Sequence, residues 1–141
     1  KAGLCPVLLS ESEMTERLWH KLAANAALNP LTALHSCRNG QVLEVAEDEV
    51  RAVCADIAAV RSALERRRVE PNEVYKAVQD CVRENEHNYS SMYQDLHVHR
   101  RRSEIDSLNG FILDTANALG IQAPANQRLA RAVRERELLY N

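Results

Sequence analysis

The sequence predicts an all-α fold, a multi-helix bundle, and three observations support this class. The 141 residues are 45% hydrophobic but only 4% aromatic, and 4 Gly and 4 Pro are too few for many short strands. Apolar residues recur at the i, i+3, i+4 spacing of amphipathic helices along most of the chain. No alternating run is long enough for a paired strand. A chain of this length forms a single domain that hides about two-thirds of its unfolded surface.

The first helix is predicted from Glu11 to about Leu28. Ser10, followed three residues later by Glu13, forms a capping box at its start. Asn29-Pro30 is predicted to end this helix and begin another, with Asn29 as the N-cap and proline in the first turn. The two helices are therefore expected to meet at a sharp corner.

Asn39-Gly40 predicts a turn, with Asn39 in the left-handed conformation. A long helix is then expected from Glu44 to about Arg67, with Arg61 at its polar edge. Its broad apolar stripe consists of Val50, Val53, Cys54, Ile57, Ala58, Val60 and Leu64.

Glu70-Pro71 ends that helix, and the next one is expected to reach about His87. Residues 90–99 fit either a helix or a loop. A helix is predicted from Glu104 to Leu119, closed by Gly120 as a left-handed C-cap with Ile121 as its apolar contact. Pro124 prevents continuation, and the last helix is predicted from about Asn126 through Leu129, Val133 and Leu138.

Composition excludes several functions. The net charge of −2 and the pI of about 6.2 predict neither a nucleic-acid partner nor an anionic membrane surface. The four glycines are scattered, so this chain has no G-x-G-x-x-G fingerprint and no phosphate loop. The basic runs 66–68 and 97–102 are interpreted as solvated helix ends. No stretch approaches the roughly 18 apolar residues of a membrane span.

The cysteines predict a reducing compartment. Cys5, Cys37, Cys54 and Cys81 lie far apart without a C-x-x-C pair, so we interpret them as free thiols in a cytoplasmic protein. The five histidines, with His97 and His99 closest together, have no compact third and fourth ligand, so no metal site is expected.

Lys21, Asn25 and Asn29 form a polar line at i, i+4 and i+8 on one helix face. In the structural interpretation, Glu13 and Arg17 are an ion pair, Lys21 is a solvated cation and Asn29 is an N-cap. In the functional interpretation, a proton donor and two amides face a small anionic or polar ligand. Spacing alone favours the structural interpretation, although asparagine is a poor residue in mid-helix.

Four strings carry a family resemblance. They are 18–25 (LWHKLAAN), continuing to 29–34 (NPLTAL) and 39–40 (NG); 88–95 (NYSSMYQD); 104–110 (EIDSLNG); and 120–126 (GIQAPAN). In order and at similar spacing, they resemble the C-terminal domain of ketopantoate reductases (2-dehydropantoate 2-reductases), from about Met14 to the end. The chain departs from the family between Asp95 and Glu104, where its basic run is denser and longer and Ser103 replaces the usual threonine.

The resemblance implies a bundle of the 6-phosphogluconate dehydrogenase C-terminal-domain-like type and an NADPH-dependent reduction of ketopantoate to pantoate, towards pantothenate and coenzyme A. It implies Lys21 as the proton donor, with Arg17 one turn away making release of its proton easier. Its substrate-binding residues would be Asn25, Asn29, Asn39, Asn88, Ser90 and Ser91. Glu104 would contact the cofactor or order the site.

The family's N-terminal Rossmann domain, which binds most of the NADPH, is not in this sequence. Residues 1–13 are expected to be the linker from it, and the isolated chain is expected to be inactive. Two alternatives stay open: a reductase of another 2-keto acid, or a non-enzymatic module that self-associates through the 44–67 helix. A homodimer is a further possibility for the whole protein.

Overall fold

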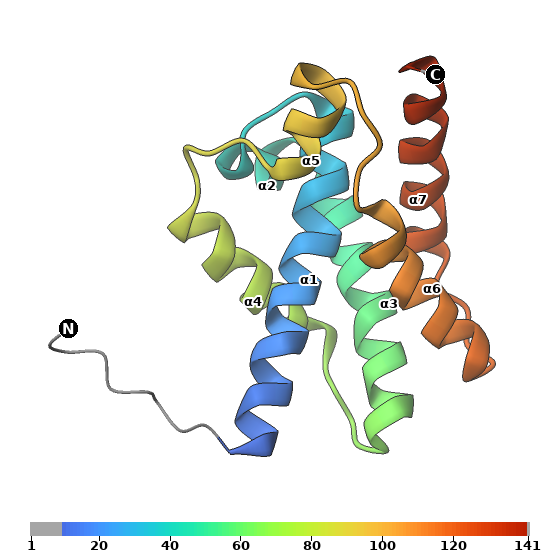
Figure 1. Cartoon of the computed structure of the whole chain (residues 1–141). Helices are drawn as coiled ribbons and strands as arrows, with labels where there is room; N and C mark the ends of the chain where they lie inside the picture. The colour runs from blue at the N-terminus through green and yellow to red at the C-terminus, as the bar shows by residue number, and fades with distance from the viewer. Residues whose placement is uncertain (1–9, 141) are drawn as a thin grey trace, which may run out of the picture.

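The computed structural model describes residues 10–140, which form a helical bundle around α1 (Glu11–His35) (Figure 1). α3 (Glu47–Glu65) and α4 (Pro71–Glu84) pack against α1 and against each other. α7 (Pro124–Glu137) contacts α1 and α3, with α6 (Asn109–Ala118) beside it. Residues 10–140 contain no strand, so the all-α prediction is confirmed.

Short helical segments join the long helices. They are η1 (Asn39–Gln41), α2 (Val42–Val45), α5 (Ser91–Tyr93), the π-helical η2 (Gln94–Val98), η3 (Ile105–Ser107) and η4 (Leu138–Tyr140). Of the predicted linker, residues 1–9, including Cys5, lie outside the described part. The remaining four residues are the N-cap and first turn of α1. Within residues 10–140, no helix combines the length and apolarity required to cross a bilayer.

The N-terminus of α1 is fixed by the predicted capping box. The Ser10 hydroxyl accepts the Glu13 amide at 3.2 Å, and the Glu13 carboxylate accepts the Ser10 amide at 3.4 Å. Glu13 is thus engaged with the cap, because its carboxylate also accepts the Ser10 hydroxyl at 2.9 Å.

The predicted corner at Asn29-Pro30 is wrong, since α1 continues through Pro30 to His35. A proline has no N–H to donate to the carbonyl four residues earlier, here that of Ala26. The side-chain amide of Asn109 donates to this carbonyl at 3.0 Å instead. The helix ends where Ser36 takes the left-handed conformation, with φ 54°.

Asn109 belongs to a buried polar network that joins four helices. Its amide nitrogen also donates to the Asn126 side-chain oxygen at 3.0 Å, and both side chains are fully buried. Asp56 of α3 accepts the backbone amides of Ala125 and Asn126 at 2.8 and 3.0 Å, and the Asn126 side-chain amide at 3.1 Å. One carboxylate therefore satisfies donors at the N-terminus of α7.

The predicted faces of Arg61 and Leu64 on α3 are wrong. Leu64 is 48% exposed, whereas Arg61 is buried, with 3% exposure. The Arg61 guanidinium donates to Glu65 at 2.9 Å and pairs with Glu16 of α1. It also lies 5.6 Å from the centre of the Trp19 ring. An arginine can be buried here because carboxylates on two helices neutralise it.

The other predicted boundaries differ by a few residues. The structure begins α3 at Glu47 after the separate α2, ends α4 at Glu84, and starts α7 at Pro124. The helix predicted from Glu104 is interrupted at Leu108, with φ −103° and ψ −90°, so η3 and α6 are separate. Leu138 is 69% exposed and is not part of the core.

The predicted C-cap at Gly120 is confirmed. Gly120 has φ 71°, and the Ile121 amide donates to the Ala116 carbonyl at 2.8 Å. Ile121 packs against the main core, which lies among α1, α3, α4 and α6. A smaller core, around Met92, Leu96 and Ile105, joins α5 and η2 to α7.

Replacing Asn109 with leucine should lower the free energy of unfolding by about 3 kcal/mol, because two buried oxygens, on Ala26 and Asn126, each lose their donor. Urea unfolding measures this change. Asn117→Ala, on the exposed side of α6, should change stability by less than about 0.5 kcal/mol. Adding Pro30→Ala to Asn109→Leu should recover part of the loss, because an alanine amide can donate to Ala26. Equal stability of Asn109→Leu and the wild type would contradict this account.

The Glu16–Arg61 pair predicts a pH dependence. The hydrogen bond from Arg61 lowers the pKa of Glu16 below its ordinary value of 4.5, against the opposing effect of burial. Stabilisation by this pair is therefore complete above the ordinary pKa and is lost as pH falls through the lowered one. Glu16→Gln should lower stability near neutrality and lose less stability between about pH 5 and about pH 3 than the wild type. Parallel curves of unfolding free energy against pH would contradict this assignment.

Candidate functional site

Lys21 and Asn25 line an open groove of about 320 Å³ between α1 and α4. Lys21 is exposed and Asn25 half-buried. The α4 wall is formed by Ala77, Asp80, Cys81 and Glu84. The groove thus presents an ammonium group and an amide beside each other, open to solvent on one side.

The far wall of the groove is acidic. Asp80 is shared by Lys76 at 3.5 Å and Arg83 at 3.3 Å, which partly neutralise it. Burial raises the pKa of the Cys81 thiol, so this cysteine is held in its neutral form. His20 also lines the groove, and its Nε2 lies 2.9 Å from a carboxylate oxygen of Glu16. The groove wall thus carries both a lysine amine and a histidine ring.

Asn29 lies one turn beyond Asn25 in mid-helix, because α1 does not restart at Pro30. It is half-buried and is not an N-cap. Lys21, Asn25 and Asn29 share one face of α1 with Leu18 and Leu22, since Leu18 and Asn25 are about two helical turns apart. This face combines polar side chains with apolar ones.

The segment 38–41 is hydrogen-bonded to the loop between α4 and α5, and we call this set of contacts the clasp. The Asn39 and Gly40 amides donate to the Asn88 and Glu86 carbonyls, both at 2.9 Å. The Asn39 side-chain amide donates to the Asn85 carbonyl at 3.2 Å, and its buried oxygen has no partner within residues 10–140. Asn39 and Asn88, distant in sequence, are thereby brought together.

The left-handed turn predicted at Asn39 is wrong. Neither Asn39 nor Gly40 has a positive φ, and Asn39 instead begins η1. Glycine is required at position 40 for another reason. A Cβ there would lie 2.8 Å from both the Cβ and the carbonyl oxygen of Glu86. The two segments can approach this closely only without a side chain at Gly40.

Ser90 ties the same loop to α1. Its buried hydroxyl accepts the Tyr93 amide at 3.0 Å as the N-cap of α5, and lies 2.7 Å from the Thr32 hydroxyl. Ser91 and Asn88, on either side, are exposed. Ser90 is therefore engaged in holding the loop, whereas the side chains of Asn88 and Ser91 are accessible to a ligand.

Of the predicted site residues, only Lys21 and Asn25 line the groove; Glu104 lies outside it, as do Asn29, Asn39, Asn88, Ser90 and Ser91. The Glu104 side chain is exposed, and its carbonyl accepts the Ser107 and Leu108 amides. The π-helical turn Gln94–Val98 lies at the start of the long basic run.

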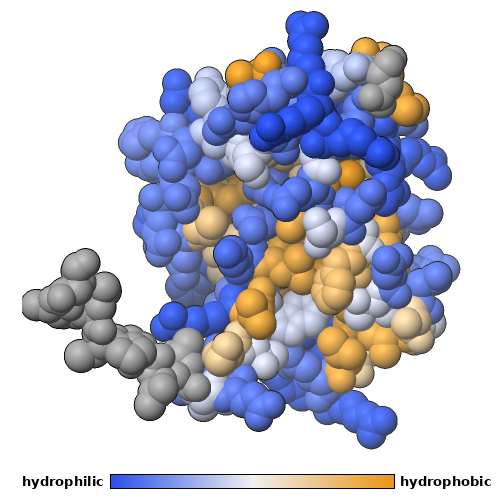
Figure 2. Space-filling view, viewed as in Figure 1, coloured by the Kyte–Doolittle hydropathy of each residue, from blue (hydrophilic) through white to orange (hydrophobic). Residues whose placement is uncertain are grey.

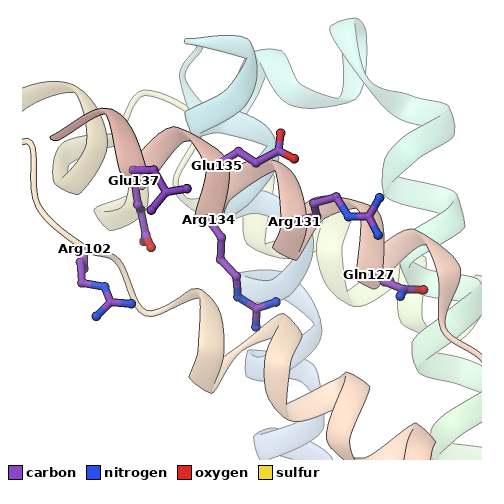
Figure 3. Close-up of a pocket in the computed structure, with 7 residues that line it drawn as sticks. Arg102, Gln127, Arg131, Arg134, Glu135 and Glu137 are labelled. Atoms are coloured by element: carbon purple, nitrogen blue, oxygen red, sulfur yellow. The ribbon is translucent and has the colours of Figure 1, made fainter. Parts of the chain in front are cut away.

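A different hollow, of about 440 Å³, lies along α7 and contains none of the predicted site residues (Figure 3). Arg102 of the loop and Arg134 and Glu137 of α7 line it. Arg134 binds Asp106, and Glu137 accepts the Ser103 hydroxyl at 2.7 Å. Arg134 and Glu137 are thus engaged within the protein, and we place the candidate site in the groove that contains the predicted residues Lys21 and Asn25.

Sequence reasoning missed the residues that support the site. Thr32 contacts Ser90, and Asn109 preserves the helix on which Lys21, Asn25 and Asn29 lie. Pro30 within an apolar helical pattern was the available signal, because it implies an unpaired carbonyl that a side chain must satisfy.

The structure is a helical domain with a polar, lysine-containing groove on its central helix. Residues 13–137 match the family model "Ketopantoate reductase PanE/ApbA C terminal". The chain belongs to the ketopantoate reductase family and corresponds to its C-terminal domain.

Known relatives agree with this assignment. The chain is 34% identical to the 2-dehydropantoate 2-reductase of Salmonella typhimurium over 140 residues, which are 98% of this chain and 45% of that protein. Its fold is similar to that of a ketopantoate reductase from Ralstonia eutropha, with a TM-score of 0.76 and 34% identity over 88% of this chain and 41% of that one. It is also similar to a D-mandelate dehydrogenase in complex with NADH, with a TM-score of 0.78 and 25% identity over 88% of this chain and 42% of that one. The chain spans less than half the length of these relatives.

Gly40→Ala should separate the two segments of the clasp and lower the free energy of unfolding by about 2 kcal/mol, because the added methyl group meets Glu86. Chemical denaturation measures the change. Gly110→Ala is the matched control, since a Cβ there meets its neighbours at ordinary distances of 3.5 Å or more. The control should be neutral or slightly stabilising in its helix. A Gly40→Ala variant as stable as the control would show that the close approach is unimportant.

Proposed function

We propose that this chain is the substrate-binding and proton-donating domain of an NADPH-dependent reductase that converts 2-dehydropantoate to pantoate. The observation that carries the proposal is the row of Lys21, Asn25 and Asn29 on a continuous helix, with the first two lining an open groove. Membership of the ketopantoate reductase family supports the choice of substrate.

Lys21 has the properties that this reaction requires of a proton donor. Reduction of the keto group forms an alkoxide, and an ammonium group beside it stabilises the charge and supplies the proton. The bound nicotinamide supplies the hydride. Asn25 and Asn29 can bind the substrate through their amides, and Asn88 and Ser91 can contribute from the clasped loop. Asn39 and Ser90 support this loop through their bonds to Asn85 and Thr32.

The 141 residues hold no glycine-rich phosphate loop, so the cofactor is expected to bind mainly to an N-terminal Rossmann domain of the whole protein. Glu104 is the residue of this chain proposed to face it. An apolar surface supports such docking (Figure 2), where apolar side chains gather over α1 and towards α6. Leu18 is 65%, Phe111 47% and Leu119 37% exposed. Burial of this face would place the polar row of α1 in a cleft between the domains.

Another 2-keto acid is the second candidate substrate, because a fold similar to a D-mandelate dehydrogenase supports more than one chemistry. Self-association through α3 is disfavoured, since its stripe residues from Val50 to Val60 are buried against the other helices. A homodimer of the whole protein would use another surface. A cytoplasmic location is supported by Cys37, Cys54 and Cys81, which are free thiols.

In the full-length reductase, Lys21→Met should lower kcat by at least about a hundredfold while leaving the fold intact, because the proton donor is removed. NADPH oxidation with ketopantoate measures the rate, and circular dichroism the fold. Arg128→Met is the control, since Arg128 is an exposed cation on α7 that does not line the groove. The isolated 141-residue chain should show no turnover. An unchanged rate in Lys21→Met would remove this residue from the proton-donor role.

A further inference from the structure

We propose that Arg38 is a positioning residue of the candidate site, which holds the loop 87–91 against α1 so that Asn88 and Ser91 can bind the substrate. This inference rests on the proposed function for its substrate. The structural part, that Arg38 holds the loop, stands on the contacts of Arg38 and can be tested separately.

Arg38 makes two contacts with the loop. Its guanidinium donates to the His87 carbonyl at 2.8 Å and lies 4.6 Å from the centre of the Tyr89 ring. These contacts hold the carbonyl of His87, just before Asn88, and the ring of Tyr89, just after it. The orientation of Asn88 therefore depends on both.

The Tyr89 ring is the first of a row of three neighbouring rings. Tyr89 stacks on Tyr93 with centroids 4.2 Å apart and planes at 19°, and Tyr93 lies 4.5 Å from the His97 ring. The His97 Nε2 lies 2.7 Å from the Ala33 carbonyl in the last turn of α1. Arg38 thus covers the outer end of a column that reaches from the loop to the helix bearing Asn25 and Asn29.

Other contacts hold the loop backbone, among them that of the Ser90 hydroxyl with Thr32. The side chains of Asn88 and Ser91 are exposed, and the Tyr89 ring lies between Arg38 and Tyr93. The backbone bonds from Asn39 and Gly40 reach Asn88 and Glu86 and do not involve the Arg38 side chain. Loss of the guanidinium should therefore loosen residues 87–91 without unfolding the domain.

The kinetic test uses the full-length reductase and ketopantoate. Arg38→Ala and Tyr89→Leu should each raise KM about tenfold and change kcat by less than about twofold, because substrate binding is weakened and Lys21 is untouched. Tyr89→Phe should behave as the wild type, because it keeps the ring. Arg128→Ala, at an exposed arginine of α7, is the matched control and should leave both constants unchanged. Unchanged KM in Arg38→Ala, or a Tyr89→Phe variant as impaired as Tyr89→Leu, would overturn the positioning role.

Hydrogen exchange of the same proteins separates this inference from the proposed function. Amides of residues 87–91 should exchange at least about fivefold faster in Arg38→Ala than in Arg128→Ala, with unchanged exchange in α3. Faster exchange in an enzyme that reduces no ketopantoate would support the positioning role of Arg38 and overturn the proposed substrate. Unchanged exchange in the loop would overturn the positioning role of Arg38, whatever the activity.

Discussion

The hydrogen bond from Asn109 to the Ala26 carbonyl is the interaction on which the arrangement of the bundle depends. Pro30 leaves that carbonyl without its partner in α1, and the amide of a residue at the start of α6 replaces the missing donor at 3.0 Å. Asn109 also binds Asn126, which binds Asp56. The hydrogen bonds that satisfy the carbonyl left by Pro30 therefore connect α1, α3, α6 and α7. An unpaired carbonyl in the core would otherwise destabilise the helix at this point.

This network also decides the geometry of the candidate site. If α1 ended at Asn29, the residues on either side of Pro30 would belong to separate helices, and the direction of the Thr32 hydroxyl would be unrelated to that of Lys21. A continuous helix instead keeps Lys21, Asn25 and Asn29 in one row and carries Thr32 on to meet Ser90. The candidate groove and the clasped loop are thus both positioned by the same helix.

Much of this molecule is predictable from local patterns. The cap at Ser10, the helix over most of α3 and the left-handed end at Gly120 follow from side chains within a few residues of one another. The errors concern partners that are distant in sequence. Arg61 is buried because Glu16 lies on another helix, and Gly40 is required because Glu86 approaches from another loop. Hydrophobic periodicity describes one helix at a time, so it cannot predict contacts between residues of different elements.

The same distant contacts change the weight of evidence for the site. The structural interpretation explained Asn29 as an N-cap and paired Glu13 with Arg17. In the structure Asn29 is in mid-helix, and the Glu13 carboxylate binds the Ser10 cap. The structural interpretation therefore does not account for Asn29 or for Glu13. Asn25 is half-buried in the groove beside Lys21. Asparagine lowers helix propensity at both positions, so its presence twice in one half-buried row is not explained by the stability of α1 and is consistent with the proposed ligand-binding role.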